Sequence, residues 1–291
     1  MDERIDAFLT TAQTERSLSP HTVSAYRNDL RQFAEFLEAE GTRNGGSAIP
    51  VSGVDRELLG GYFLHLRERG YSPATIARKV AALKSFFHYL RRTGEIATDP
   101  TDGIGSPEVK KAPPVAISAD AVQALITYAE QRDTPEGRRA SAMLRLMYAT
   151  GMRVSELVTL DVSDIDFERG TVRVAGRGSR ARVLPLDAAV LVATRDYLDH
   201  ARQFLARNAP DQPALVLNHR GQRLTRQGFW LIMKSLVRES GLQLTVTPHT
   251  LRHSFATRQI DEGRALEELR QLLGHASIST TQVYTQLAAS H

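Results

Sequence analysis

The sequence contains no cysteine, which excludes disulfide bonds, thiolate metal sites and a thiol nucleophile. It also has no apolar run of the roughly 18 residues that a membrane-spanning helix requires. The first residues, Met-Asp-Glu-Arg-Ile-Asp, are charged and lack the apolar core of a signal peptide. We therefore expect a cytoplasmic protein without membrane association.

Lysine is scarce. Of 37 basic side chains, five are lysines (Lys79, Lys84, Lys110, Lys111 and Lys234), which leaves 32 arginines. Arginine forks bind phosphates with two parallel hydrogen bonds, but the same bias can reflect genome composition. The formal net charge of +4 is compatible with a nucleic-acid partner and equally with an ordinary solvated surface.

The pattern along the chain predicts two domains, as expected for 291 residues with 42% hydrophobic content. Residues 1–104 carry apolar positions at helical spacing and predict a helical bundle. Residues 105–116 are rich in proline, glycine and lysine and predict a linker. Residues 117–291 predict a mixed domain with a β-hairpin over 165–185 and helices around 187–207, 224–240, 248–262, 265–273 and 277–286. The expected fold class is mainly α with a small β-sheet.

The most informative stretch is the last fifth of the chain, where His249-Thr-Leu-Arg252 precedes Leu273-Gly-His275 and then Tyr284. Two histidines and an arginine can move protons and bind an anion, and a tyrosine hydroxyl can act as a nucleophile. Since His249 and Arg252 are three residues apart on one expected helix, both can meet one phosphate. These groups suffice to break and rejoin a phosphodiester without metal or ATP.

Each of these residues also has a simpler interpretation. Arg153 follows a helix stop and begins the next helix, where backbone N–H groups favour an anion, yet taken alone it is an ordinary surface arginine. Tyr284 could be partly buried packing, and His275 could follow a helix C-cap as a satisfied histidine.

His249 and His253 are four residues apart, which superficially suggests a zinc pair. The glutamate that a metalloprotease carries beside the first histidine is here Thr250. We therefore expect no metal site.

The joint pattern resembles the tyrosine recombinases, and within them the bacterial Xer type. The likeness extends over nearly the whole chain, and such a set of motifs is highly specific. The matching strings are Leu18-Ser-Pro-His-Thr-Val-Ser-Ala-Tyr26, Thr150-Gly-Met-Arg153-Val-Ser-Glu-Leu157, Arg182-Val-Leu-Pro-Leu186, His249-Thr-Leu-Arg252-His-Ser-Phe-Ala-Thr257, Leu273-Gly-His275 and Thr280-Thr-Gln-Val-Tyr284-Thr285.

The resemblance implies a SAM-like core-binding domain followed by a tyrosine-recombinase catalytic domain. It implies that Tyr284 attacks the scissile phosphate, forming a 3′-phosphotyrosyl bond and releasing a 5′-hydroxyl. Arg153 and Arg252 would clamp the non-bridging oxygens. His249 would act as acid and base toward the tyrosine, and His275 would hydrogen-bond the phosphate. No cofactor is needed, because the bond energy is stored covalently.

The chain departs from the family in two places. The family uses a lysine at the hairpin tip to protonate the leaving 5′-oxygen, and here that position is Arg177. An arginine, with a pKa above about 12, is a poor proton donor, although it can still hydrogen-bond the oxygen. After Tyr284 only residues 285–291 follow, where relatives commonly have a helix that docks on the neighbouring protomer.

The resemblance also implies the partners. Both domains would close around double-stranded DNA at a short, roughly palindromic site, with the linker around Lys110 and Lys111 allowing closure. A tetrameric synapse, a paralogous recombinase and a septal DNA translocase would complete a system for chromosome dimer resolution. Alternatives are an integrase of a phage or mobile element, which the absence of a preceding arm-binding domain disfavours, and a catalytically weakened DNA-binding derivative. Candidate DNA contacts are Arg78, Lys79, Lys84, Arg180, Arg182, Arg223 and Arg226.

Overall fold

The computed structural model describes residues 1–15, 18–43, 45–105, 117–176, 181–207, 209–275 and 277–288. The chain divides into two compact units, Met1–Lys111 and Ala112–His291. Of the segment expected to be a linker, all residues after Gly105, including Lys110 and Lys111, lie outside the described residues.

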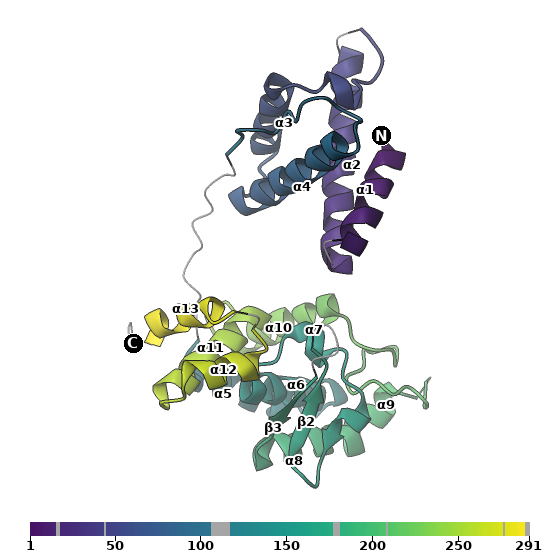
Figure 1. The fold of residues 1–291 in the computed structure, drawn as a ribbon. Helices are drawn as coiled ribbons and strands as arrows, with labels where there is room; N and C mark the ends of the chain where they lie inside the picture. Colours follow the sequence, from purple (N-terminus) through teal and green to yellow (C-terminus); the bar gives the residue numbers. More distant parts are fainter. Residues whose placement is uncertain are drawn as a thin grey trace. The chain divides into compact units, whose positions relative to one another are not determined.

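The described part of the first unit is a bundle of α-helices (Figure 1). Side chains fix where two of these helices begin. Asp55 accepts a hydrogen bond from the Leu58 N–H at 2.8 Å, and Ser72 accepts one from Thr75, directly before Pro73. The elements are α1 (Asp2–Glu15), α2 (Pro20–Arg43), a 3₁₀ turn (Val51–Gly53), α3 (Arg56–Glu68) and α4 (Pro73–Arg92).

The core of the first unit is aromatic. Phe33 on α2 meets Tyr62 on α3 edge to face, with 5.0 Å between the ring centroids. On α4, Phe86 and Phe87 are fully buried. Burying one such ring contributes roughly 2 kcal/mol to folding. The helical spacing of these aromatic residues is what makes a single shared core possible.

The second unit is predominantly helical with one small sheet. Its helices are α5 (Ala119–Gln131), α6 (Pro135–Thr150), α7 (Val154–Leu157), α8 (Ala188–Tyr197), α9 (Gln203–Leu205), α10 (Arg226–Ser240), α11 (Pro248–Asp261), α12 (Leu266–Leu273) and α13 (Ser279–Ala288). A π-helical turn (Leu198–Arg202) joins α8 to α9. A 3₁₀ turn (Val162–Asp164) leads into β1 (Ile165–Asp166), followed by β2 (Thr171–Val174) and β3 (Arg182–Pro185).

The sheet is antiparallel in the order β1-β2-β3. Val172 lies opposite Leu184, and both are buried, whereas Val183 on the opposite face of β3 is exposed. The expected hairpin is therefore present as β2 and β3, with Gly176 at the start of its tip. The strand β1 was not expected, because two residues are too few to show an alternating pattern.

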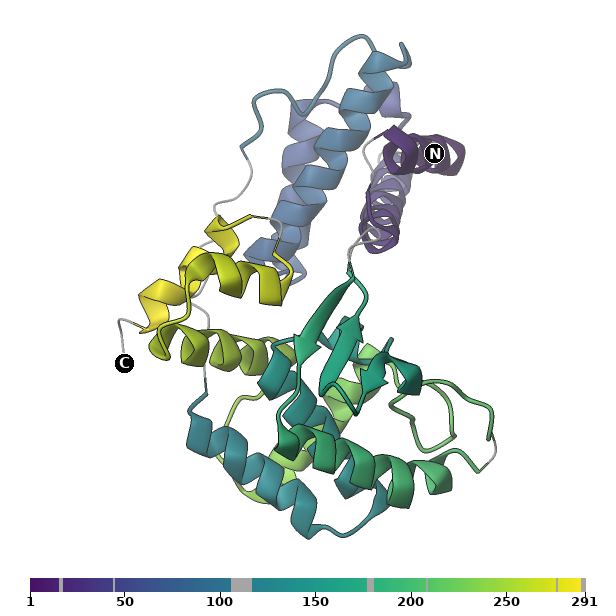
Figure 2. The same cartoon turned by 60° about the horizontal axis from the view of Figure 1, so that its bottom comes forward.

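Helix α6 lies at the centre of the second unit. Met143 and Met147 are fully buried, and the helix packs against α5, α8 and α11. Figure 2 shows the arrows of β2 and β3, with the chain passing from β3 into α8. Helices α11, α12 and α13 contact one another and bring the C-terminal motifs together (Figure 1). The end of α6 therefore lies beside α11.

The expected fold class, mainly α with a small β-sheet, is confirmed. Within the described ranges, no helix is both long enough and apolar enough to cross a membrane.

Candidate active site

The turn after α6 positions Arg153. Gly151 ends α6 in the left-handed conformation, with φ of 61°, and a Cβ there would lie 2.2 Å from the Phe255 ring of α11. Only glycine lets the chain turn this close to α11. Two residues later, Arg153 is the N-cap of the short helix α7, and its backbone N–H donates to the Glu156 carboxylate at 2.6 Å.

Glu156 organises two arginines. Its carboxylate accepts hydrogen bonds from the Arg153 guanidinium at 2.9 Å and from both terminal nitrogens of Arg182, each at 2.9 Å. Burial raises the pKa of Glu156, but the hydrogen bonds from Arg182 and Arg153 outweigh it and leave the pKa below its ordinary value. Glu156 is therefore ionised at neutral pH, and it fixes Arg153 relative to β3.

Arg252 is the most enclosed cation of the site. The Thr247 side chain caps α11 and Pro248 takes its first position, which places Arg252 one turn into the helix. Arg252 is 5% exposed, and its guanidinium donates to the Gly151 carbonyl at 2.6 Å and to the Leu273 carbonyl at 2.5 Å. Burial, and then repulsion from Arg153, lower the pKa of Arg252 to about 10, so it remains charged at neutral pH.

The C-terminal end of α12 supplies acceptors to all three arginines. Arg182 donates through Nε to the Leu272 carbonyl at 2.7 Å, Arg252 reaches Leu273, and Arg153 reaches Gly274 at 3.2 Å. Free carbonyls at a helix end carry partial negative charge and attract cations. Gly274 ends the helix with φ of 62°, and a Cβ there would lie 3.1 Å from an Arg182 nitrogen.

His275 follows this helix end and is buried. Its Nε2 lies 2.9 Å from Arg252, and its Nδ1 lies 2.9 Å from the Thr281 hydroxyl. Because a guanidinium can only donate, Nε2 accepts, and the ring proton sits on Nδ1. Burial, together with the positive charge of Arg252, lowers the pKa of His275 to about 4. His275 is neutral at neutral pH and orients Arg252.

Tyr284 on α13 completes the cluster. It is 4% exposed, and its ring is nearly parallel to that of His275, with 6.3 Å between the centroids. Its hydroxyl lies 3.1 Å from Nδ1 of His253. Burial raises the pKa of Tyr284, while the charges of Arg252 and Arg153 act in the opposite direction. The phenol is therefore protonated at rest and lies close to positive charge.

His249, expected to serve as the acid and base, is exposed on the first turn of α11. Its ring centroid is 6.4 Å from that of His253. The residue at the tyrosine hydroxyl is thus His253, one helical turn further along.

The assembled site is a cluster of cations beside a phenol. Arg153, Arg182 and Arg252 converge, and among the described residues Glu156 is the carboxylate that pairs with Arg153 and Arg182. The surplus of positive charge suits an anion with two or more oxygens, such as a phosphate. Five expected residues, Arg153, His249, Arg252, His275 and Tyr284, lie on or beside this cluster, and Arg177 lies outside the described residues.

Two residues of the cluster had no role assigned from the sequence. Glu156 was part of a motif, and its place three residues after an N-cap was the available signal. His253 shares a helix face with His249, which had suggested only a zinc pair.

The candidate DNA contacts have different surroundings. Lys79 is 4% exposed and binds Asp29 at 2.9 Å, Arg182 binds Glu156, and Arg223 donates to the carbonyls of Val158 and Leu160. Lys79 is buried beside Asp29, which does not fit the expectation that it contacts DNA. Arg182 and Arg223 keep part of their surface exposed, and their contact with DNA stays a prediction. Arg78 is partly exposed beside Asp29, Lys84 is half-buried, Arg226 is exposed, and Arg180 lies outside the described residues.

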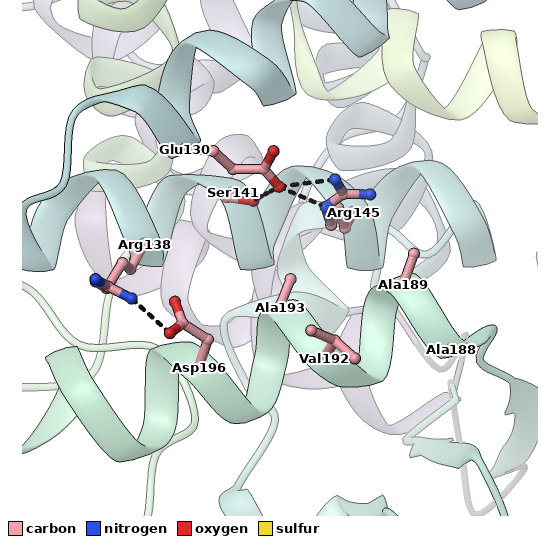
Figure 3. A pocket seen from close by; sticks show the side chains of 9 residues that line it. All are labelled: Glu130, Arg138, Ser141, Arg145, Ala188, Ala189, Val192, Ala193 and Asp196. Atoms are coloured by element: carbon pink, nitrogen blue, oxygen red, sulfur yellow. Dashed lines mark hydrogen bonds and ion pairs between the residues drawn. The ribbon is translucent and has the colours of Figure 1, made fainter.

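A hollow of about 590 Å³ lies elsewhere, between α5, α6 and α8 (Figure 3). Its floor carries Val192 and Ala193, and ion pairs between Arg145 and Glu130 and between Arg138 and Asp196 border it. It shares no residue with the arginine cluster, so it is not part of the candidate active site.

The chain is similar to known proteins over nearly its whole length. Residues 116–291 match the family model described as the phage integrase family, and residues 5–94 match the phage integrase N-terminal SAM-like domain. The chain is 47% identical to tyrosine recombinase XerC of Herpetosiphon aurantiacus, over 99% of this chain and 92% of that one. It is 39% identical to tyrosine recombinase XerD of Listeria innocua, over 99% and 95%. The fold matches XerH recombinase bound to a palindromic difH substrate, with a TM-score of 0.73, 22% identity and coverage of 99% and 92%.

Proposed function

Because the chain belongs to the phage integrase family of tyrosine recombinases, we propose that the arginine cluster and Tyr284 cleave and rejoin DNA. The chain is a site-specific DNA recombinase. Tyr284 is the nucleophile: its oxygen bonds to the scissile phosphorus, the bond from phosphorus to the 5′-oxygen breaks, and a 3′-phosphotyrosyl intermediate forms. The released 5′-hydroxyl later reverses this step on a partner strand, which is why no nucleotide cofactor is needed.

Arg153 and Arg252 bind the non-bridging oxygens of the phosphate. Their donors already face acceptors in the resting site: the Gly274 carbonyl for Arg153, and the Leu273 carbonyl for Arg252. A phosphate that enters exchanges contacts with neutral carbonyls for contacts with charged oxygens, and these strengthen as negative charge grows in the transition state.

The histidines divide the remaining work. His275 accepts from Arg252 through Nε2 and keeps that guanidinium aimed at the phosphate. For His275 to hydrogen-bond the phosphate directly, its Nε2 must first give up the hydrogen bond from Arg252. His249, exposed beside the site, accepts the proton that leaves Tyr284 when DNA covers this face.

The leaving 5′-oxygen needs a proton, and Arg177 stands where the family has a lysine. We propose that Arg177 stabilises the oxygen by hydrogen bonding while water supplies the proton, which gives slower cleavage than a lysine would.

The biological role that fits best is resolution of chromosome dimers in the bacterial cytoplasm. Relatives named XerC and XerD both align with 99% of the chain, which favours a system of two paralogous recombinases forming a tetramer on a short, nearly palindromic site. A septal DNA translocase would activate it. Integration of a mobile element is the alternative, and genomic neighbourhood would distinguish the two.

The observation that carries the proposal is a buried tyrosine hydroxyl next to three clustered arginines, of which Arg153 and Arg182 pair with a single carboxylate, Glu156, among the described residues. Incubation with nicked suicide DNA substrates tests it. We expect a covalent protein–DNA adduct with the wild-type chain, none with Tyr284→Phe, and an unchanged amount with Tyr128→Phe, which removes a hydroxyl on α5. Binding without any adduct across candidate sites would instead indicate a DNA-binding derivative without cleavage activity.

A further inference from the structure

The hydroxyl of Tyr284 has a specific partner in the resting site. His253 lies on α11, and its Nδ1 is 3.1 Å from the hydroxyl oxygen on α13. The two rings are 5.3 Å apart at their centroids and tilted by 51°. Because α11 and α13 pack directly against each other, this contact is part of a helix interface rather than a chance approach of two surface groups.

A second ring limits where the phenol can move. His275 lies 6.3 Å from the Tyr284 ring with an interplanar angle of 14°. His275 is itself fixed by Arg252 and Thr281. The two histidines therefore restrict the plane of the tyrosine ring, but of these two contacts only the one with His253 is a hydrogen bond to the hydroxyl.

The charges around the contact indicate which group donates. Burial, and then repulsion from His249 and Arg252, lower the pKa of His253 to about 4, so the ring is neutral at neutral pH. Arg252 acts on Tyr284 as a positive charge and a hydrogen-bond donor, and both effects lower the pKa of the phenol. The O–H then points to His253, whose Nδ1 accepts it.

We propose that His253 is a positioning residue that holds the Tyr284 hydroxyl beside Arg252, ready for attack on the phosphate. The proposal rests on the proposed function, in which Tyr284 is the nucleophile. His253 is not the base in that reaction: its pKa is lowered to about 4 while burial raises the pKa of Tyr284, so the proton stays on the tyrosine. The proton passes to another acceptor once phosphate binds, and His253 contributes orientation.

Two substitutions at His253 distinguish the role of its Nδ1 from that of its Nε2. In His253→Asn the amide oxygen stands two bonds from Cβ, as Nδ1 does, whereas in His253→Gln it stands three bonds away, as Nε2 does. The proposal predicts that the asparagine variant keeps the single-turnover cleavage rate within about threefold. The glutamine and alanine variants lose about 10-fold to 100-fold, as expected for a misplaced nucleophile.

The rates are measured as adduct formation on a nicked suicide substrate at saturating DNA, and DNA affinity is measured separately. Since His253 orients the nucleophile and does not bind DNA in the proposal, affinity changes less than threefold in every variant. His219→Gln, which alters an exposed histidine in a turn, controls for loss of an imidazole. Thermal unfolding of each variant shows that the rates compare folded proteins.

The possible outcomes distinguish failure of the positioning role from failure of the proposed function. Equal rates for the wild type and all three His253 variants would overturn the positioning role, and so would a glutamine variant faster than the asparagine variant. A uniform loss in folded Asn, Gln and Ala variants would also overturn it, because packing alone would then explain the effect. If the wild type forms no adduct while binding DNA, the proposed function itself fails; substitution at His253 cannot produce that result.

Discussion

Two buried cations, one in each unit, have opposite surroundings. Lys79 in the first unit is 4% exposed, and Arg252 in the second is 5% exposed. Lys79 lies 2.9 Å from the Asp29 carboxylate, whereas Arg252 donates to backbone carbonyls and to His275 and forms no ion pair within the described part of the chain. A buried charge is costly unless it is paired, so Lys79 is a completed structural contact, and Arg252 remains available to an incoming anion.

The largest effect is expected from replacing each of the two cations by methionine. Arg252→Met removes a phosphate ligand, so single-turnover cleavage falls about 1000-fold, while the free energy of unfolding changes by only about 1 kcal/mol. Lys79→Met leaves Asp29 buried with a weaker set of partners and costs about 3 kcal/mol, with cleavage by the folded protein within about threefold. Urea unfolding and suicide-substrate cleavage of both variants measure the contrast. Equal stability losses, or a large rate loss in Lys79→Met, would contradict it.

Glu156 tests what happens when the counter-ion of the site is removed. Glu156→Gln weakens the contacts to Arg153 and Arg182 and lowers the free energy of unfolding by about 2 kcal/mol at pH 7. The folded-state pKa of Glu156 lies below its ordinary value of 4.5, so this contribution is present above that value and is lost as pH falls below it.

The deficit of the Glu156→Gln variant should therefore shrink between pH 5 and pH 3, as measured by urea midpoints at each pH. A deficit that stays constant through this range would show that the carboxylate charge is not what stabilises the site.

A substitution at Gly274 tests whether the arginines depend on the backbone carbonyls at the end of α12, which accept their hydrogen bonds as a carboxylate would. Gly274→Ala is strained at a φ of 62° and places a methyl group 3.1 Å from Arg182, so we expect a loss of about 1 kcal/mol and about 10-fold slower cleavage. Gly241→Ala is the matched control, because Gly241 ends α10 with φ of 70° and a Cβ there meets nothing within 4 Å. It should share the stability loss and keep the cleavage rate. A similar rate loss in both variants would mean that backbone strain alone is responsible.

The smallest change in cleavage rate is expected from replacing Arg177 by lysine, which compares the two cations as proton donors. Arg177→Lys supplies a better proton donor and should speed single-turnover cleavage several-fold, up to about 10-fold. A substrate with sulfur in place of the 5′-bridging oxygen needs no proton, so the gain should vanish there. Arg169→Lys, at a largely exposed arginine of the same unit, is the control. No gain on the normal substrate would refute the idea that this position limits the rate.

Much of the fold could be predicted from the sequence. Apolar residues at helical spacing predicted the bundle of the first unit and the C-terminal helices, and the alternation around Val172 and Leu184 predicted the hairpin. The strand β1 escaped detection because pairing, rather than its own two residues, defines it.

The charged residues were harder to predict. By residue type alone, Lys79 resembles any cation that contacts DNA, and only its buried position beside Asp29 distinguishes it. Arg223 binds carbonyls more than 60 residues earlier in the chain, which no local pattern reveals.

The sequence by itself determined the helices, the hairpin and the set of reactive residue types, because propensity, periodicity and motif spacing are local properties of the chain. The tertiary structure decided which partners those residues have. Arg182 meets Leu272 across 90 positions, Arg252 meets Gly151 across 101, and Tyr284 meets His253 rather than His249. Hydrogen bonds depend on distances of a few ångströms between segments far apart in sequence, and only the packing of α6, α11, α12 and α13 sets those distances.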